Sequence, residues 1–359
     1  MSVDLSVLPE KIRTKVENLA QYIEFERIIE KGGNGYVLVG NNTVLRRQVA
    51  VKFYYWGNGD HAEPALLARL ECDNVLKVHH AESIDAEDAF FMTPFCEHGD
   101  LDDAMATRKF GPVEAVEVIT QVAAGVSYLH GKSYLHRDLK PSNVFCVGGN
   151  HFVIGDFGSV VAQNDQGYAE TKTRHSLLYR PPEELAEHRS YKQGDVYQLG
   201  LVLFQLLGGK LPYEEAEWLN TKELTKYRAL DGVERQLFAT AIIEKKIAKG
   251  KIADLSTLPC WVPSNLVSVV RRCAQTNREK RFESAAALIA KLNNMRGDLP
   301  NWWIGDYPIL HRDRKKIRVV EVGDRYVIEK MVNGANAWRT ERQLKPLSLE
   351  EAIQMAEGL

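Results

Sequence analysis

The 359-residue chain is poor in the features that mark specialised classes of protein. It has only five cysteines and no Cys-x-x-Cys pair, which argues against a zinc site or a disulfide framework and favours a reducing compartment. Basic and acidic residues nearly balance, with 46 Lys and Arg against 48 Asp and Glu. The chain therefore lacks the positive excess that is typical of a dedicated nucleic-acid binder.

Long hydrophobic runs and an apolar N-terminal segment are also missing. The longest apolar stretch, 199–207, contains Gln205 and is far shorter than the roughly 20 residues that cross a membrane. The N-terminus mixes acids and bases from the start and has no apolar core of a signal peptide. We therefore expect a cytoplasmic protein that makes no contact with a membrane.

Hydrophobic residues make up 45% of the chain, which is ordinary for a globular protein, and the length suits about two domains of roughly 150 residues each. The pattern is β-rich first, then helical, then mixed, so the expected fold class is α+β. The expected units are a lead-in helix in 1–23, a small β-rich lobe at 24–95, a larger helical lobe at 96–297 and a small appended module at 298–359.

Apolar spacing predicts the individual elements. Helices are expected at 9–20, 63–70, 113–129, 198–207, 221–227, 232–247, 264–273 and 284–293, and strands of the small lobe include 75–79 and 89–92. The appended module is expected to be β-β-(β)-α, with strands at 317–322 and 325–332, a third strand suggested only by a tight turn, and a helix opened by a capping box at Ser348.

Glycines cluster between two predicted strands of the small lobe. Gly32, Gly33 and Gly35 follow Glu30 and precede Val37. Because glycine has no Cβ, backbone N–H groups there can close over an anionic phosphate. An ordinary hairpin turn has the same composition, so the motif alone does not establish a phosphate site.

A lysine lies within an apolar strand of the same lobe. Lys52 shares its face with Ala50, because side chains alternate along a strand. Glu63, eleven residues later on a predicted helix, can pair with Lys52 and hold its ammonium toward a phosphate. A surface ion pair is the equally open alternative.

Two acidic motifs follow in the helical lobe. Asp138, Lys140 and Asn143 fall within six residues on a proline-containing loop. An aspartate can accept a hydroxyl proton, a lysine can neutralise a transferring phosphoryl group, and an asparagine can hold a divalent cation. Asp156, flanked by Gly155 and Phe157, supplies a second oxygen ligand of the kind that Mg²⁺ requires.

Taken together and in this order, the motifs resemble those of the eukaryotic-type (Hanks) Ser/Thr protein kinase family, over about 24–295. The resemblance implies a bilobal fold that binds ATP and Mg²⁺ between the lobes. It implies a catalytic set of Asp138 as base, Lys140 on the γ-phosphate, Lys52 on the α- and β-phosphates and Glu63 as the partner of Lys52. It implies that Asn143 and Asp156 are the metal ligands.

The resemblance also places the nucleotide. Val37 and Ala50 would lie above the adenine and Phe145 below it, with Thr93 as gatekeeper and Asp100 at the ribose. The residues implied in ATP binding are Glu30, Gly32, Gly33, Gly35, Val37, Ala50, Lys52, Thr93, Phe95, Cys96, Asp100 and Phe145. Structural positions implied in the same way are Asp195, which starts the central helix, and the pair Glu183 and Arg281.

Two positions depart from the family pattern. Glu30 stands where the family has the first glycine of the loop, and a carboxylate there repels phosphate. Pro64 directly follows Glu63, and the interval from Lys52 to Glu63 is short. These departures leave open a pseudokinase or scaffold that binds partners without transferring phosphate.

Substrate class and regulation are read from the same resemblance. Lys140 and Ser176 match the Ser/Thr branch, so the expected partners are protein substrates; a small-molecule phosphotransferase is the alternative. Arg137 before Asp138 suggests control by phosphorylation of Thr171 or Thr173 in the loop, where an arginine can pair with the phosphate. Autophosphorylation in trans would require a transient homodimer.

The appended module carries basic residues interleaved with Trp302, Trp303, Tyr326 and Trp338. Such a pattern can bind nucleic acid by charge and stacking. A solvated face over a small core, acting as a docking or packing module on the large lobe, is the preferred reading. A second His-Arg-Asp triplet at 311–313 lacks the Lys and Asn of the first and is taken as coincidence.

Overall fold

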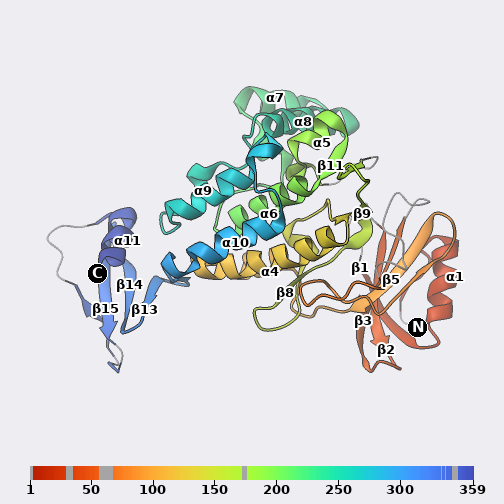
Figure 1. Cartoon of the computed structure of the whole chain (residues 1–359), viewed down its shortest axis with the longest axis horizontal. Helices are drawn as coiled ribbons and strands as arrows, with labels where there is room; N and C mark the ends of the chain where they lie inside the picture. The colour runs from red at the N-terminus through yellow and green to blue at the C-terminus, as the bar shows by residue number, and fades with distance from the viewer. Residues whose placement is uncertain are drawn as a thin grey trace.

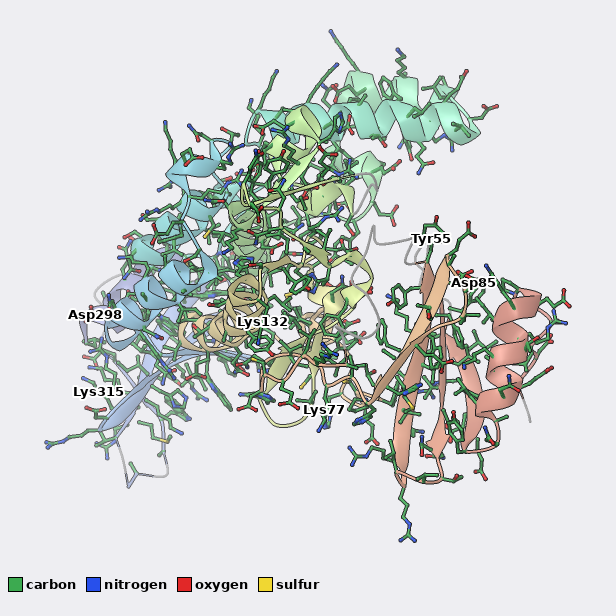
Figure 2. All side chains as sticks on the ribbon, turned by 45° about the vertical axis from the view of Figure 1, so that its right-hand side comes forward. Tyr55, Lys77, Asp85, Lys132, Asp298 and Lys315 are labelled. Carbon is green, nitrogen blue, oxygen red and sulfur yellow. The ribbon has the colours of Figure 1, made fainter. Side chains whose placement is uncertain are left out.

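The computed structural model describes residues 3–29, 35–55, 68–171, 176–332, 334–335, 337–341 and 347–359. Figure 1 shows a β-rich lobe and a small C-terminal module at opposite ends of the long axis, with a helical lobe between them. In Figure 2, Tyr55 and Asp85 mark the β-rich lobe, Lys132 the helical lobe, and Lys315 the C-terminal module. The kinase-like bilobal fold expected from the sequence is confirmed.

The small lobe is a five-stranded antiparallel sheet in the order β1-β2-β3-β5-β4. Its strands are β1 (Ile23–Ile29), β2 (Tyr36–Asn42), β3 (Arg47–Tyr55), β4 (His80–Ser83) and β5 (Asp88–Pro94). The strand predicted at 75–79 is wrong, because β4 begins only at His80. Val75 and Leu76 instead pack into the core of the large lobe, where the Leu76 N–H donates to the Ile154 carbonyl at 2.8 Å.

The two faces of this sheet have different partners. Paired residues of antiparallel strands share a face, and the face with Leu38, Val51 and Phe90 packs on helix α1 (Glu10–Leu19) in one apolar cluster. The N-terminal segment is therefore part of the core of the small lobe, which its polar composition did not indicate. The opposite face carries Lys52, and it faces the large lobe because Lys52 contacts Asp156 there.

The large lobe is built around helix α6 (Lys192–Leu206), which is buried almost all round, as its apolar sequence predicted. It packs against α4 and α9, and α4 in turn packs against α10. The helices of this lobe are α3 (Leu101–Thr107), α4 (Pro112–Gly131), α5 (Pro182–Glu187), α6, α7 (Thr221–Ala229), α8 (Gly232–Ala248), α9 (Ser264–Cys273) and α10 (Ala285–Met295).

Short strands carry the loops of the large lobe. They pair as β6 (Tyr134–Leu135) with β9 (Val161–Ala162), β7 (Val144–Cys146) with β8 (Phe152–Ile154), and β10 (Tyr168–Glu170) with β11 (Arg189–Tyr191). Asp138 lies on the loop between β6 and β7, and Asp156 lies between β8 and β9.

The C-terminal module is a five-stranded antiparallel sheet with one helix. Its elements are β12 (Trp302–Ile304), β13 (Pro308–Arg312), β14 (Lys315–Val322), β15 (Arg325–Val332), β16 (Arg339–Thr340) and α11 (Leu349–Gly358). The capping box at Ser348 is present. The sequence pattern did not indicate β12, which has only three residues, or β13, which begins with Pro308 and shows no apolar–polar alternation.

The module rests on the large lobe. Trp261 packs against the apolar cores of both. Gly111, directly before α4, approaches the module so closely that a Cβ on it would lie 1.7 Å from the Trp302 carbonyl oxygen. Trp302 is 1% exposed, and its indole N–H donates to Glu357 at 2.8 Å. Among the described residues, no helix is long and apolar enough to span a membrane.

Candidate active site

The loop after β6 is held by a buried carboxylate at the start of α6. Asp195 accepts the backbone N–H groups of His136 at 2.9 Å and Arg137 at 2.8 Å, and it contacts the His130 ring at 2.8 Å. Burial alone would raise the pKa of Asp195, but the hydrogen bond and charge of His130 bring it below its usual value. Asp195 thus binds the loop as an anion.

Gln198, also on α6, completes this support. The sequence pattern did not indicate it as a site residue. The Gln198 amide donates to the Arg137 carbonyl at 2.7 Å, and its oxygen accepts the Leu139 N–H at 2.9 Å. These backbone groups flank Asp138, so one side chain holds both neighbours of that residue. Gln198 also donates to the Tyr179 carbonyl at 3.2 Å and is 1% exposed. The available signal was an amide within a mostly apolar helix, about one turn after Asp195.

The loop brings Asp138, Lys140 and Asn143 together. The Lys140 ammonium lies 2.9 Å from Asp138 Oδ2 and 2.8 Å from Ser176 Oγ. The Asn143 amide donates to the Asp138 carbonyl at 2.6 Å and to its Oδ2 at 3.0 Å. Asp138 Oδ1 is buried and has no hydrogen-bond partner among the described residues. An unpaired buried carboxylate oxygen is costly unless a ligand or a reacting group uses it.

Lys52 and Asp156 meet from the two lobes and form an ion pair that is mostly shielded from solvent. Asp156 has a left-handed backbone with φ of +55°, a strained conformation that aims its carboxylate at the small lobe. Burial acts to raise the pKa of Asp156, but the charge and hydrogen bond of Lys52 lower it overall. Lys140 also lowers this pKa, which links the pair to the loop of Asp138.

The residues expected around the adenine come from both lobes. Ala50 pairs directly with Thr93, and Lys52 pairs with Val37, so all four share the face of the sheet that meets the large lobe. Phe145 on β7 is half-buried. A Cβ on Gly155 would lie 2.7 Å from its ring, so Gly155 is the residue that this packing tolerates.

Phe95, Cys96 and Asp100 lie in the segment that connects the two lobes, and each makes structural contacts there. The Phe95 N–H donates to the Gln48 carbonyl at 3.1 Å. Burial, followed by the neighbouring Cys146, raises the pKa of the Cys96 thiol to about 11. Asp100 is 3% exposed and caps α3 by accepting the Asp103 N–H at 3.1 Å. The expected contact of Asp100 with a ribose remains a prediction.

Several expected site residues lie outside the described part of the chain: Glu30, Gly32, Gly33, Glu63 and Thr173. Gly35 is described and has φ of +109°, and a Cβ there would lie 1.9 Å from the Phe53 carbonyl oxygen. Only glycine is compatible with that conformation and that close approach.

The segment after Asp156 is anchored on the large lobe. Arg281 and Glu183 form a bidentate pair with both distances 2.7 Å, and Arg281 is 2% exposed. The Thr171 hydroxyl lies 2.7 Å from the Ser190 hydroxyl, which donates to the buried Glu184 carboxyl at 2.7 Å. Arg137 is 3% exposed, and its charge acts on the Glu184 carboxyl.

The donor set suits a magnesium nucleotide. The Asn143 Nδ2 atom donates to Asp138, so the Asn143 Oδ1 atom remains for a cation, and Asp156 adds a carboxylate. The Gly155 N–H donates to the Asn143 carbonyl at 2.9 Å, so the segments that carry these two oxygens are joined. Mg²⁺ binds through one or two protein oxygens plus phosphate oxygens. The residues present fit that group.

Comparison with known families agrees with this geometry. The family model described as "Protein kinase domain" matches residues 23–292, which is most of the chain and spans both lobes.

Curated relatives also match part of the chain. The mouse interferon-induced, double-stranded RNA-activated protein kinase is 32% identical over 206 residues, covering 51% of this chain and 40% of that protein. The serine/threonine-protein kinase PknJ of Mycobacterium tuberculosis is 30% identical, covering 52% and 34%, and PrkC of Bacillus subtilis is 25% identical, covering 52% and 30%. The matched region thus spans two fifths or less of these relatives.

Proposed function

Because the chain belongs to the protein kinase family, we propose that it transfers the γ-phosphate of ATP to Ser and Thr hydroxyls of protein substrates. One observation supports this most directly. Lys52 with Asp156, and Lys140 with Asp138 and Asn143, come from separate segments and form one connected polar site. Ser/Thr kinases among the relatives favour the same class of acceptor.

The residues of this chain divide the reaction between them. Asp138 Oδ1 is the free oxygen that accepts the proton of the attacking hydroxyl. Lys140 lies beside it and neutralises charge on the transferring phosphoryl group. Lys52 holds the α- and β-phosphates. Asn143 and Asp156 hold Mg²⁺, which when bound supplies charge neutralisation across the phosphates.

The support beneath Asp138 gives these groups a fixed geometry. Asp195 and Gln198 bind the backbone on both sides of the loop before any substrate arrives. A preorganised site spends no binding energy on ordering its own loop during the reaction. This is why we assign the base to Asp138 and a supporting role to α6.

We also propose the domain limits and their roles. The small lobe spans 24–95 and the large lobe 96–297; the helix in 1–23 stabilises the small lobe through its contacts with the sheet. Residues 298–359 form a packing module on the large lobe through Trp261 and Trp302. Nucleic acid stays a lesser candidate partner for this module.

Regulation through the loop is a finer part of the proposal. A phosphate on Thr171 would face the Ser190–Glu184 contact, and a carboxyl there opposes a second anion. We therefore propose Thr173 rather than Thr171 as the autophosphorylated residue that pairs with Arg137, by a reaction between two copies of the chain. Mass spectrometry after incubation with ATP tests this: an active enzyme without phosphate in 159–179 rules it out.

The catalytic proposal is tested by phosphate transfer to a basic carrier protein. We expect Asp138→Asn to lose about 10²–10⁴-fold in kcat, because a general base contributes that much. Nucleotide binding measured by calorimetry should survive, since Asp138 is not assigned to ATP. Equal transfer by wild type and Asp138→Asn would instead support the pseudokinase or scaffold.

A further inference from the structure

Beside the loop of Asp138, the large lobe contains a cavity of about 390 Å³. Lys140 and Ser176 form the wall that it shares with the candidate active site. Asp102 from α3, Tyr213, and Glu215 at the start of the short 3-10 helix Glu215–Trp218 form walls that the proposed chemistry does not use. The cavity therefore opens next to the place where an acceptor hydroxyl would meet Asp138.

The charge of this cavity is negative. Among the described residues that line it, Asp102 and Glu215 are the acids and Lys140 is the one base. The Lys140 ammonium is already engaged by Asp138 and Ser176. Burial and then the adjacent Glu214 raise the pKa of Glu215, and no neighbouring cation of the described chain offsets these effects. A cation entering the cavity would favour the charged form of Glu215.

An aromatic ring stands at the same wall in a fixed position. The Tyr213 hydroxyl donates to Asp102 at 2.6 Å and accepts from the Gln205 amide at 3.2 Å. The Tyr213 side chain is nevertheless 56% exposed, so its ring remains available to a ligand. Tyr rings attract guanidinium and ammonium groups, most strongly where the cation is partly desolvated.

The remaining walls are apolar. Leu177, Leu178 and Ile243 also line the cavity. A side chain with a hydrocarbon stem and a cationic head matches this arrangement, because the stem can lie on the apolar wall while the head reaches the carboxylates. The volume is at the lower end of ordinary ligand sites, which span roughly 300–1,000 Å³, and it suits one long side chain.

We propose that this cavity receives a basic side chain of the protein substrate, close in sequence to the accepting Ser or Thr, with Asp102 and Glu215 as its specificity residues. Arginine is favoured over lysine, because a planar guanidinium can pair with a carboxylate and stack on the Tyr213 ring at the same time. An acidic or phosphorylated side chain is repelled by the same two carboxylates. The inference rests on the proposed kinase function and names its substrate class.

The test uses peptides with one Ser acceptor, in which each flanking position carries Arg, Lys, Ala or Glu in turn. For the full chain, we expect kcat/KM to be roughly tenfold higher for Arg than for Ala at one position, with Lys between them and Glu lowest. The difference should lie mainly in KM. It should shrink as salt is raised, because screening weakens attraction at a partly exposed site.

Charge reversal provides the decisive variants. In Glu215→Lys, we expect the preference to invert, so that the Glu peptide becomes better than the Arg peptide. Glu217→Lys is the matched control, because Glu217 is an exposed acid on the same 3-10 helix and does not line the cavity. Its Arg preference should equal that of wild type. A variant that merely loses stability would lower both rates without inverting their order.

The outcomes separate the cavity from the catalytic proposal. Equal kcat/KM for Arg and Ala at every position, or the same preference in Glu215→Lys and Glu217→Lys, overturns the cavity proposal and leaves the kinase proposal intact. Where no peptide is phosphorylated, the kinase proposal fails. Fluorescence anisotropy of labelled Arg and Ala peptides then decides the cavity directly, since tighter Arg binding that depends on Glu215 supports it and equal binding overturns it.

Discussion

Gln198 offers the sharpest test of how the fold positions the reaction. Replacing it with alanine removes the amide contacts to the Arg137 carbonyl, the Leu139 N–H and the Tyr179 carbonyl. Each buried backbone group left without a partner costs about 1–3 kcal/mol, so the free energy of unfolding should fall by about 2–5 kcal/mol after partial relaxation. The Asp195 contacts remain, so the fold should persist.

The kinetic effect is larger than the loss of stability alone explains. Asp138 lies between two released backbone groups, and a displacement of about 1 Å at a reacting group can cost about 10²-fold in rate. We expect Gln198→Ala to lower kcat by about 10–100-fold while KM for ATP changes little, because Lys52 and Asp156 keep their places. Steady-state kinetics below the unfolding transition measures both quantities.

A matched control is available in the same lobe. Gln121 on α4 holds a loop in the same way, with its amide donating to the Asn150 carbonyl at 3.0 Å and accepting the Phe152 N–H at 2.9 Å. Gln121→Ala should lose less stability, because Gln121 is half-buried and water can replace its contacts, and its kcat should stay within about twofold of wild type. A Gln198→Ala variant whose kcat also stays within about twofold of wild type would refute the positioning role of Gln198.

Other consequences can be checked by unfolding and kinetics. Arg281→Ala should destabilise the large lobe by about 3–5 kcal/mol in chemical denaturation, because Glu183 is left as a buried lone charge; a paired replacement by Leu and Met should cost much less. Burial raises the pKa of Glu184 from 4.5 to about 7, so the stability that this group contributes is complete below pH 4.5 and is lost as pH rises through 7. In wild type, the unfolding free energy should therefore decline by about 3 kcal/mol between pH 5 and 8 because of Glu184, and Glu184→Gln should flatten this decline. The same decline in Glu184→Gln would contradict this assignment. Trp302→Ala should lower stability by about 3–5 kcal/mol, measured by thermal unfolding with Trp303→Ala, which is 64% exposed, as the near-neutral control. Lys52→Met should raise KM for ATP more than it raises KM for the protein substrate, as initial rates would show.

The local sequence predicted much of the candidate site. The order of the glycine cluster, Lys52, the loop of Asp138 and the segment of Asp156 indicated the chemistry, because each motif needs particular residue types at short spacing. The helices at 113–129, 232–247 and 264–273 followed from apolar periodicity and agree closely with α4, α8 and α9. Short-range patterns of this kind survive folding because the same residues make the element and its apolar face.

Other features arise from contacts between distant segments. The sequence left Gln198 as one polar residue in a buried helix, and only folding brought its amide to both neighbours of Asp138. Asp100 was expected at a ribose, yet its carboxylate also caps α3. Likewise the helix predicted at 9–20 packs on the sheet of the small lobe, and the sequences of β12 and β13 showed no strand pattern.

Residue chemistry and local spacing by themselves therefore predicted which groups would carry phosphoryl transfer and in which order they occur along the chain. Tertiary structure decided which of them meet, which backbone groups hold them, and where a cavity borders the site. The physical reason is the sequence distance over which each kind of interaction acts. Propensity and periodicity act over a few residues, whereas the Lys52–Asp156 pair and the wall formed by Asp102 and Tyr213 join positions about a hundred residues apart.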